Sequence, residues 1–206
     1  MKNRNVYLYG AGGHAKVIRD ILEAQGFIVE GITDDNPATV KFMEMEVMHS
    51  PKSGEEYIIS IGNCDIRQKI AEKLEKSGCS FATAVHPSAI VSPHASIEEG
   101  SVIMQGAIVQ SGAKIGRHCI VNTGASVDHD CSIGDYVHIA PGVTLCGEVE
   151  VSAGCWIGAG SVVVQGVKIG AGSLIGAGSV VCEDVPEGVV AYGNPCRVKR
   201  EIEKKR

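Results

Sequence analysis

The residues with the clearest chemical potential form the segment Val127-Asp128-His129-Asp130. An unperturbed imidazole has a pKa near 6.5, so His129 could accept a proton from an attacking amine or hydroxyl at neutral pH. Asp130 follows directly and could orient the ring and stabilise its protonated form. We therefore predict a general base at His129 with Asp130 as its partner. The alternative, from these residues alone, is a surface histidine without a role.

A second group of residues points to nucleotide binding. The run Gly10-Ala-Gly-Gly-His-Ala15 fits the loose G-x-G-x-x-A pattern between an apolar strand and a helix. Backbone N–H groups at such a helix start can bind a pyrophosphate. Asp34 and Asp35 follow where dinucleotide-binding domains place a ribose-binding carboxylate. A domain this small has room for half a dinucleotide fold, so a single nucleotide such as a UDP-sugar fits better than NAD. A tight turn with a solvated Asp pair is the alternative.

Alternating short strands and helices must position this loop. Strands are expected at Val6–Tyr9, Phe27–Ile32 and Glu56–Ile61, and helices at His14–Gln25 and Asp65–Ser77. This order predicts a small Rossmann-like α/β domain with a parallel sheet over residues 1–84.

A different rhythm begins at residue 85. Every sixth position from Val91 to Val181 is aliphatic, and a residue that is mostly small lies two positions before each. A period of six predicts a hexapeptide solenoid, with three hexads per coil and about five coils over residues 85–190. A C-terminal tail, 191–206, follows. A sandwich with coincidental spacing is the alternative. The cysteines Cys119, Cys131 and Cys155 fall on the small interior positions, so we expect them to be packing residues.

Composition limits the remaining classes. Of 206 residues, 44% are hydrophobic and 21% are charged, which excludes disorder as the main state. A net charge of -5 argues against a nucleic-acid partner. No stretch approaches the ~20 apolar residues of a membrane helix, and the first apolar run is too short for a signal peptide. We expect no membrane insertion and a cytoplasmic location. The cysteines lack the paired spacing of a structural zinc site.

The whole chain resembles one family. The motifs are G-A-G-G-H-A-K from residue 10, D-D at 34, I-G-N at 61 and H-P-S-A at 86, followed by the solenoid. Together they resemble the sialic-acid O-acetyltransferase / UDP-bacillosamine N-acetyltransferase family of hexapeptide-repeat sugar acyltransferases. This resemblance implies a left-handed parallel β-helix and a homotrimer with acetyl-CoA bound between neighbouring β-helices. It also implies a nucleotide-sugar acceptor in the N-terminal domain, without a metal.

The resemblance also implies residue roles. His129 matches the family's general base, and Asp130 stands where the bacillosamine enzyme has Glu, one methylene longer. Acceptor binding falls on Ala11, Gly12, Gly13, Asp34, Asp35 and Gly62, with His14 and Asn63 close by. Acetyl-CoA contact falls on His138, Ala159 and Ala177.

The spacing of two histidines indicates how subunits meet. His138 lies between interior Val137 and Ile139, so it should face outward, nine residues or half a coil from His129. A face of six residues is roughly 20 Å long, so these two side chains emerge from different sides of one coil. They can converge only when a neighbouring subunit supplies one of them. His94 and His118 fall on outward corners, where we expect solvated side chains.

These expectations combine into one predicted activity, which is acetyl-CoA-dependent N-acetylation of the 4-amino group of a UDP-linked amino-dideoxy sugar by direct transfer. The alternatives are a sialic-acid O-acetyltransferase, a non-catalytic nucleotide-sugar-binding assembly factor and an NAD-binding regulator.

Overall fold

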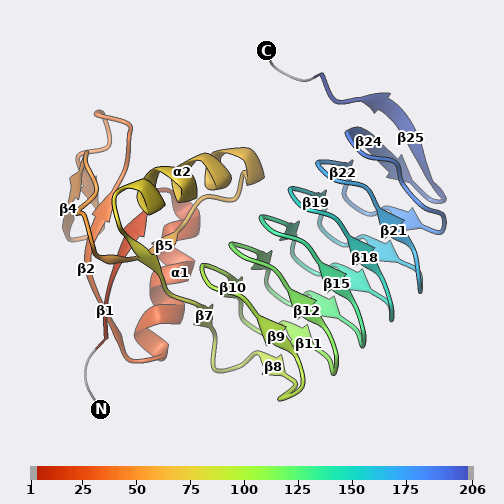
Figure 1. Cartoon of the computed structure of the whole chain (residues 1–206), viewed down its shortest axis with the longest axis horizontal. Coiled ribbons are helices and arrows are strands. Elements are labelled where there is room, and N and C mark those ends of the chain that lie inside the picture. Colours follow the sequence, from red (N-terminus) through yellow and green to blue (C-terminus); the bar gives the residue numbers. More distant parts are fainter. Residues whose placement is uncertain (1–3, 204–206) are drawn as a thin grey trace.

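The computed structural model describes residues 4–203. An α/β domain lies beside the first coils of a long β-helix, and a C-terminal hairpin closes the far end (Figure 1). This arrangement confirms the predicted fold class, a small α/β domain followed by a parallel β-helix.

The N-terminal sheet has the strand order β3-β4-β2-β1-β5-β6 and is parallel except where β3 meets β4. The bounds are β1 Arg4–Tyr9, β2 Phe27–Thr33, β3 Lys41–Phe42, β4 Met45–Met48, β5 Glu56–Ile59 and β6 Ser80–Phe81. The three long strands are those predicted. Strands β3, β4 and β6 were not predicted, because strands of two to four residues carry too little periodicity to recognise.

Two helices cover the two faces of this sheet. They are α1 (Gly13–Ala24) and α2 (Cys64–Lys76). Side chains alternate along β1, so Val6 and Leu8 pack with α1 while Tyr7 and Tyr9 pack with α2. The core on the α1 side continues into the first β-helix coils, so the two domains share packed surface.

Three faces form the β-helix. Up to β23, paired strands are parallel and lie eighteen residues apart, while β24 and β25 at the far end depart from this spacing and pair antiparallel with each other. The eight-stranded face holds β7 Ala84–Val85, β10 Val102–Ile103, β13 Ile120–Val121, β16 His138–Ile139, β19 Trp156–Ile157, β22 Leu174–Ile175, β24 Val189–Gly193 and β25 Cys196–Glu201. The six-stranded face holds β8 Ile90–Val91, β11 Ile108–Val109, β14 Ser126–Val127, β17 Thr144–Leu145, β20 Val162–Val163 and β23 Val180–Val181. The five-stranded face holds β9 Ser96–Ile97, β12 Lys114–Ile115, β15 Ser132–Ile133, β18 Glu150–Val151 and β21 Lys168–Ile169.

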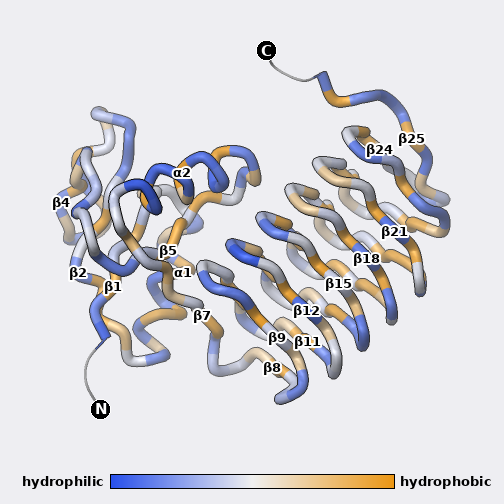
Figure 2. The backbone as a smooth tube through the Cα atoms, in the orientation of Figure 1, coloured by the Kyte–Doolittle hydropathy of each residue, from blue (hydrophilic) through white to orange (hydrophobic). Residues whose placement is uncertain are grey.

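The predicted aliphatic positions fill the β-helix interior, and hydrophobic and hydrophilic stretches alternate along each coil (Figure 2). Cys119, Cys131 and Cys155 are free thiols and buried, which confirms them as packing residues. The solenoid extends beyond the five coils expected from the hexads. Strand β7 precedes the first hexad on the eight-stranded face, and β24 and β25 add a hairpin to its far end.

Corners separate the faces, and one sequence-based expectation about them is wrong. His118 does lie at a corner, with a left-handed φ of 54°, but its side chain is fully buried. The ring packs edge-on against Phe81 of the N-terminal domain and stacks on Tyr136. The hexad register gives the direction of a side chain from its own coil but does not reveal that another domain covers that corner. Within residues 4–203, no helix is long and apolar enough to cross a membrane.

Candidate active site

His129 and Asp130 form a hydrogen-bonded pair at the corner between β14 and β15. The distance from His129 Nδ1 to Asp130 Oδ2 is 2.9 Å, and the two side chains are 51% and 63% exposed. Asp130 has a φ of 58°, a left-handed conformation that aspartate tolerates better than most residues. A carboxylate can only accept, so Nδ1 carries the proton and Nε2 keeps its lone pair. The shorter aspartate therefore makes the contact.

Negative charge around this corner favours the protonated imidazole. The pKa of His129 is raised, above all by the hydrogen bond that its ring donates to Asp130, with further contributions from Asp128 and Glu148. The Asp128 carboxylate also accepts the His129 backbone N–H at 2.8 Å. These groups make the ring a stronger base than a free histidine.

The imidazole lies against Gly147, one coil further along. A Cβ at position 147 would lie 2.6 Å from both Nε2 and Cε1 of His129. Because that approach is too close for any side chain, a glycine at 147 is what permits this orientation of the ring.

The glycine-rich loop lies at the carboxyl ends of β1 and β5. In the sheet, β2 and β5 lie on opposite sides of β1, so the strand order reverses at this point. Ligands bind at such a reversal in open α/β sheets. Gly10 has a φ of 105°, and a Cβ there would meet the Ile61 side chain at 2.6 Å. Gly12 and Gly13 are exposed, and no side chain caps the start of α1. The first N–H groups of α1 are thus available to an anion.

The two aspartates are engaged rather than simply solvated. Asp34 accepts the Ala11 N–H at 2.8 Å and the Asn36 N–H at 2.9 Å, which fixes the loop. Asp35 accepts from the Tyr9 hydroxyl at 2.7 Å and from Lys73 at 2.8 Å. The Lys73 ammonium is the first cause of the lowered pKa of Asp35. Asp34 therefore organises the loop, while Asp35 lies at its exposed rim.

His138 points away from the β-helix interior, as predicted, but the N-terminal domain covers it and it is 5% exposed. Its Nδ1–H donates to the Gly62 carbonyl at 3.0 Å, and its Nε2 accepts from Asn122 Nδ2 at 3.0 Å. The Trp156 ring lies 4.2 Å away, centroid to centroid. Burial is the main cause that lowers the pKa of His138 to about 4, so the ring is neutral at physiological pH.

The structure brings His14, Gly62 and Asn63 close to His138. The two imidazole centroids lie 6.4 Å apart, and the Nε2 atom of His14 is buried without a hydrogen-bond partner within residues 4–203. Burial lowers the pKa of His14 to about 4. Asn63 caps α2 by accepting the Ile66 N–H at 3.0 Å. The residues predicted to bind the acceptor thus meet the eight-stranded face of the β-helix.

Ala159 and Ala177 lie elsewhere. They are exposed on successive coils, at the edge between the eight-stranded and six-stranded faces. His129 and Asp130 lie on the other edge of the six-stranded face. Within one chain, the predicted base and the predicted acetyl-CoA positions are therefore on different edges, as the half-coil spacing requires.

Sequence reasoning missed three residues of this region: Asn122, Trp156 and Arg67. The signal for Trp156 was present, because it follows His138 by eighteen residues and must stack on it in the next coil. Asn122 lies sixteen residues from its partner His138, on the preceding coil, and the repeat alone did not single it out. No pattern in the sequence pointed to Arg67, because its β-helix partners lie 51 and 69 residues away.

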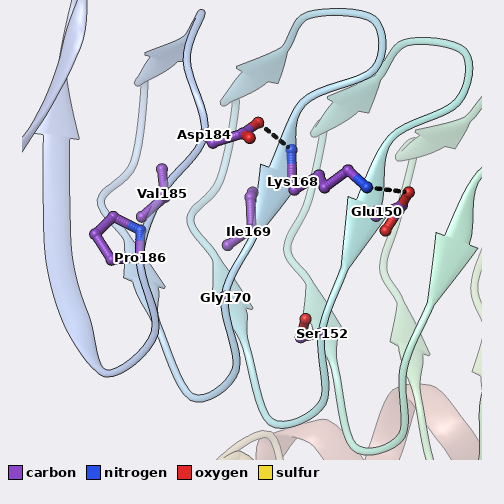
Figure 3. Close-up of a pocket in the computed structure, with 8 residues that line it drawn as sticks. All are labelled: Glu150, Ser152, Lys168, Ile169, Gly170, Asp184, Val185 and Pro186. Carbon is purple, nitrogen blue, oxygen red and sulfur yellow. Dashed lines mark hydrogen bonds and ion pairs between the residues drawn. The ribbon is translucent and has the colours of Figure 1, made fainter.

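A hollow of about 450 Å³ lies on the five-stranded face (Figure 3). There the Lys168 ammonium forms an ion pair with Glu150, and the Lys168 backbone N–H donates to the Asp184 carboxylate. None of the predicted site residues lines it. Within the part of the chain that the structure describes, no cluster of three His, Cys, Asp or Glu side chains could hold a metal ion.

Comparison with known proteins identifies both domains. Residues 5–74 match the PglD N-terminal domain, and residues 112–147 and 148–183 each match the bacterial transferase hexapeptide (six repeats) model. A curated relative, UDP-N-acetylbacillosamine N-acetyltransferase of Bacillus subtilis (strain 168), is 41% identical over 49% of this chain and 51% of its own length. The matched segment thus spans about half of that relative.

Solved structures match almost the whole chain. A histidine-to-asparagine variant of perosamine N-acetyltransferase from Caulobacter crescentus, in complex with CoA and GDP-perosamine, has a TM-score of 0.90 at 37% identity. The match covers 96% of this chain and 97% of that one. The acetyltransferase domain of PglB from Neisseria gonorrhoeae FA1090, in complex with acetyl coenzyme A, has a TM-score of 0.87 at 35% identity, covering 96% and 100%. This chain belongs to the family of hexapeptide-repeat sugar acetyltransferases that carry a PglD N-terminal domain.

Proposed function

We propose that this protein transfers the acetyl group of acetyl-CoA to the 4-amino group of a UDP-linked amino-dideoxy sugar. The observation that carries the proposal is the His129–Asp130 pair, an exposed imidazole whose Nδ1 is held by a carboxylate while Nε2 is left to accept a proton. A non-catalytic assembly factor has no use for such a pair.

The acceptor site is the loop cluster of the N-terminal domain. The uncapped start of α1 supplies N–H donors for a pyrophosphate, and Asp34 holds that loop in place through Ala11. Gly12, Gly13 and Asp35 border it, while Gly62 and Asn63 form the neighbouring turn. His14, which is half-buried, lies beside this turn at the domain interface, with its ring 6.4 Å from that of His138.

The donor site is the edge that carries Ala159 and Ala177. Small exposed residues on successive coils leave room for a pantetheine arm to lie along the edge. His138, on the adjoining eight-stranded face, keeps a neutral ring beside that edge. Acetyl-CoA supplies the activated acyl group as a thioester.

A homotrimer completes the site in this proposal. The outward residues along the six-stranded face are mostly apolar, and none of them is buried in the isolated chain: Ile90, Ile108, Ser126, Thr144, Val162 and Val180. Ile90 is 65% exposed. Packing this face on a second subunit would cover the row and bring His129 of one chain towards the donor edge of its neighbour.

The chemistry is a direct transfer. His129 Nε2 takes a proton from the amine as the amine nitrogen forms a bond to the thioester carbonyl carbon. The carbon–sulfur bond then breaks, and the CoA thiolate leaves and is protonated by the imidazolium. Asp130 stabilises the positive ring between the two proton transfers.

The first test measures CoA release from acetyl-CoA as free thiol. The acceptors are a UDP-linked 4-amino sugar, GDP-perosamine and free sialic acid, and an enzyme-only blank corrects for the eight protein cysteines. We expect turnover with the UDP-linked amine. Turnover with GDP-perosamine alone would assign a GDP-linked sugar, in place of a UDP-linked one, as the acceptor. Turnover with sialic acid alone would show that the acetylated group is a hydroxyl.

A variant then tests the base. His129→Ala should abolish transfer while thermal stability and oligomeric state stay normal, because the side chain is exposed and packs no core. His94→Ala is the matched control, since His94 is an exposed histidine two coils earlier in the same corner column as Asp130. Normal transfer by His129→Ala would refute the mechanism.

A further inference from the structure

Arg67 is a buried cation held by backbone carbonyls of two domains. It lies in the first turn of α2 and is 1% exposed. Its Nη1 donates to the carbonyls of Ile61 and Gly62, both at 2.8 Å. On the β-helix side, Nε donates to the His118 carbonyl and Nη2 to the Tyr136 carbonyl, both at 2.7 Å. Within residues 4–203 no carboxylate pairs with it.

A buried guanidinium is costly unless every donor finds an acceptor. The planar fork of arginine meets this need, because its donors point to several carbonyls at once. The two β-helix carbonyls belong to corners with left-handed φ values of 54° and 60°, at His118 and Tyr136. Their rings stack 5.3 Å apart, with planes 4° from parallel, under the N-terminal domain. At most other corners the residue with a left-handed φ is glycine. The β-helix surface that packs on the N-terminal domain therefore has two aromatic rings at positions of this kind.

One of the carbonyls that Arg67 binds belongs to the turn 61–63, between β5 and α2. The Gly62 carbonyl takes hydrogen bonds from both Arg67 Nη1 and His138 Nδ1. Two cationic or polar donors, one from each domain, thus fix the same carbonyl. Cys64 adds a weaker contact, since its thiol donates to the Cys155 carbonyl at 3.6 Å.

We propose that Arg67 is a positioning residue for acetyl transfer, which holds the turn 61–63 in fixed register on the β-helix so that the bound sugar presents its amine to the acyl donor. This inference rests on the proposed function. It assigns to Arg67 no contact with either substrate. It follows that the loss of its fork should slow transfer more than it weakens binding.

The test uses Arg67→Lys, which keeps the charge but replaces the fork by one ammonium that cannot span both carbonyl pairs. We expect kcat to fall by roughly 10–100-fold, because a displacement near 1 Å has that effect on an oriented reaction. The KM for acetyl-CoA should stay within about twofold, since Ala159 and Ala177 lie at the other edge of the eight-stranded face from the carbonyls that bind Arg67. Arg67→Gln serves as a second variant if the lysine variant does not fold.

Phe81→Leu is the matched control. Phe81 packs on His118 in the same interface but makes no hydrogen bond to the turn. It should lower the thermal midpoint, as the Arg67 variants do, while kcat stays within about twofold. Hydrogen exchange of the peptide that contains residues 61–63 should accelerate in Arg67→Lys and not in Phe81→Leu.

The outcomes separate the two proposals. If the unmodified protein acetylates no nucleotide-linked amine, the proposed function fails, and the exchange rates alone decide whether Arg67 fixes the turn. Unchanged kcat in a folded, active Arg67→Lys protein overturns the positioning role. An equal loss of kcat in Phe81→Leu overturns it too, because interface stability in general would then explain the effect.

Discussion

The contact between Gly147 and the proposed base offers a direct way to displace His129 without removing it. Gly147→Ala adds one methyl group at a position where the imidazole lies 2.6 Å from the new Cβ. Ordinary carbon contacts lie near 3.5 Å, so the ring must retreat by about 1 Å. His129 is half exposed and can move, so the change should perturb the site rather than the fold.

The structure also indicates the size of the effect. A misplacement of about 1 Å in an oriented reacting group costs roughly 100-fold in rate, or about 2.7 kcal/mol in activation free energy. Gly147 does not adopt a left-handed φ, so alanine fits the backbone. The smaller entropy of the unfolded chain then stabilises the folded protein by about 0.4–1 kcal/mol. We expect kcat to fall while the free energy of unfolding stays level or rises.

The assay compares kcat for CoA release with the free energy of unfolding from urea denaturation. Gln165→Ala is the matched control, because Gln165 is exposed and occupies the equivalent position one coil beyond Gly147. It should leave both quantities near their original values. A Gly147→Ala protein that is stable and keeps full kcat would show that the position of this imidazole does not govern the reaction.

Two further predictions concern pH. A general base must be neutral, and Asp130 raises the pKa of His129, so Asp130→Asn should move the acidic limb of the kcat/KM profile to lower pH and lower the plateau by about tenfold or more; an unmoved limb would assign it to another group. The pKa of His118 is lowered to about 4 in the folded protein, chiefly by burial, whereas an unfolded histidine titrates near 6.5. The unfolded chain therefore binds more protons between these values, and stability should be lost as pH falls from about 6.5 to 4. His118→Phe should lower the number of protons taken up on unfolding in this pH range by about one, which is measured from the pH dependence of urea midpoints. An unchanged pH dependence would contradict the neutral, buried state of this ring.

The sequence by itself determined the main architecture. The six-residue period fixes which side chains enter the β-helix, because the aliphatic position and the small position before it recur on every face. Where a serine occupies the small position, as at Ser101, its hydroxyl bonds a backbone carbonyl. The strand and helix patterns before residue 84 likewise predicted β1, α1, β2, β5 and α2. The same register separated His129 from His138 by half a coil, so their different sides could be predicted from spacing alone.

Only the tertiary structure decided what covers each outward position. His138 and His118 both point away from their coil, yet the N-terminal domain buries them, and Arg67 joins that domain to two corner carbonyls. The hydrogen-bond partners are 51 and 69 residues away in sequence. A periodic pattern records the environment inside one repeat, whereas docking depends on which distant backbone groups meet. The exposed His129–Asp130 corner could therefore be predicted from neighbouring residues, while the buried cluster around Arg67 could not.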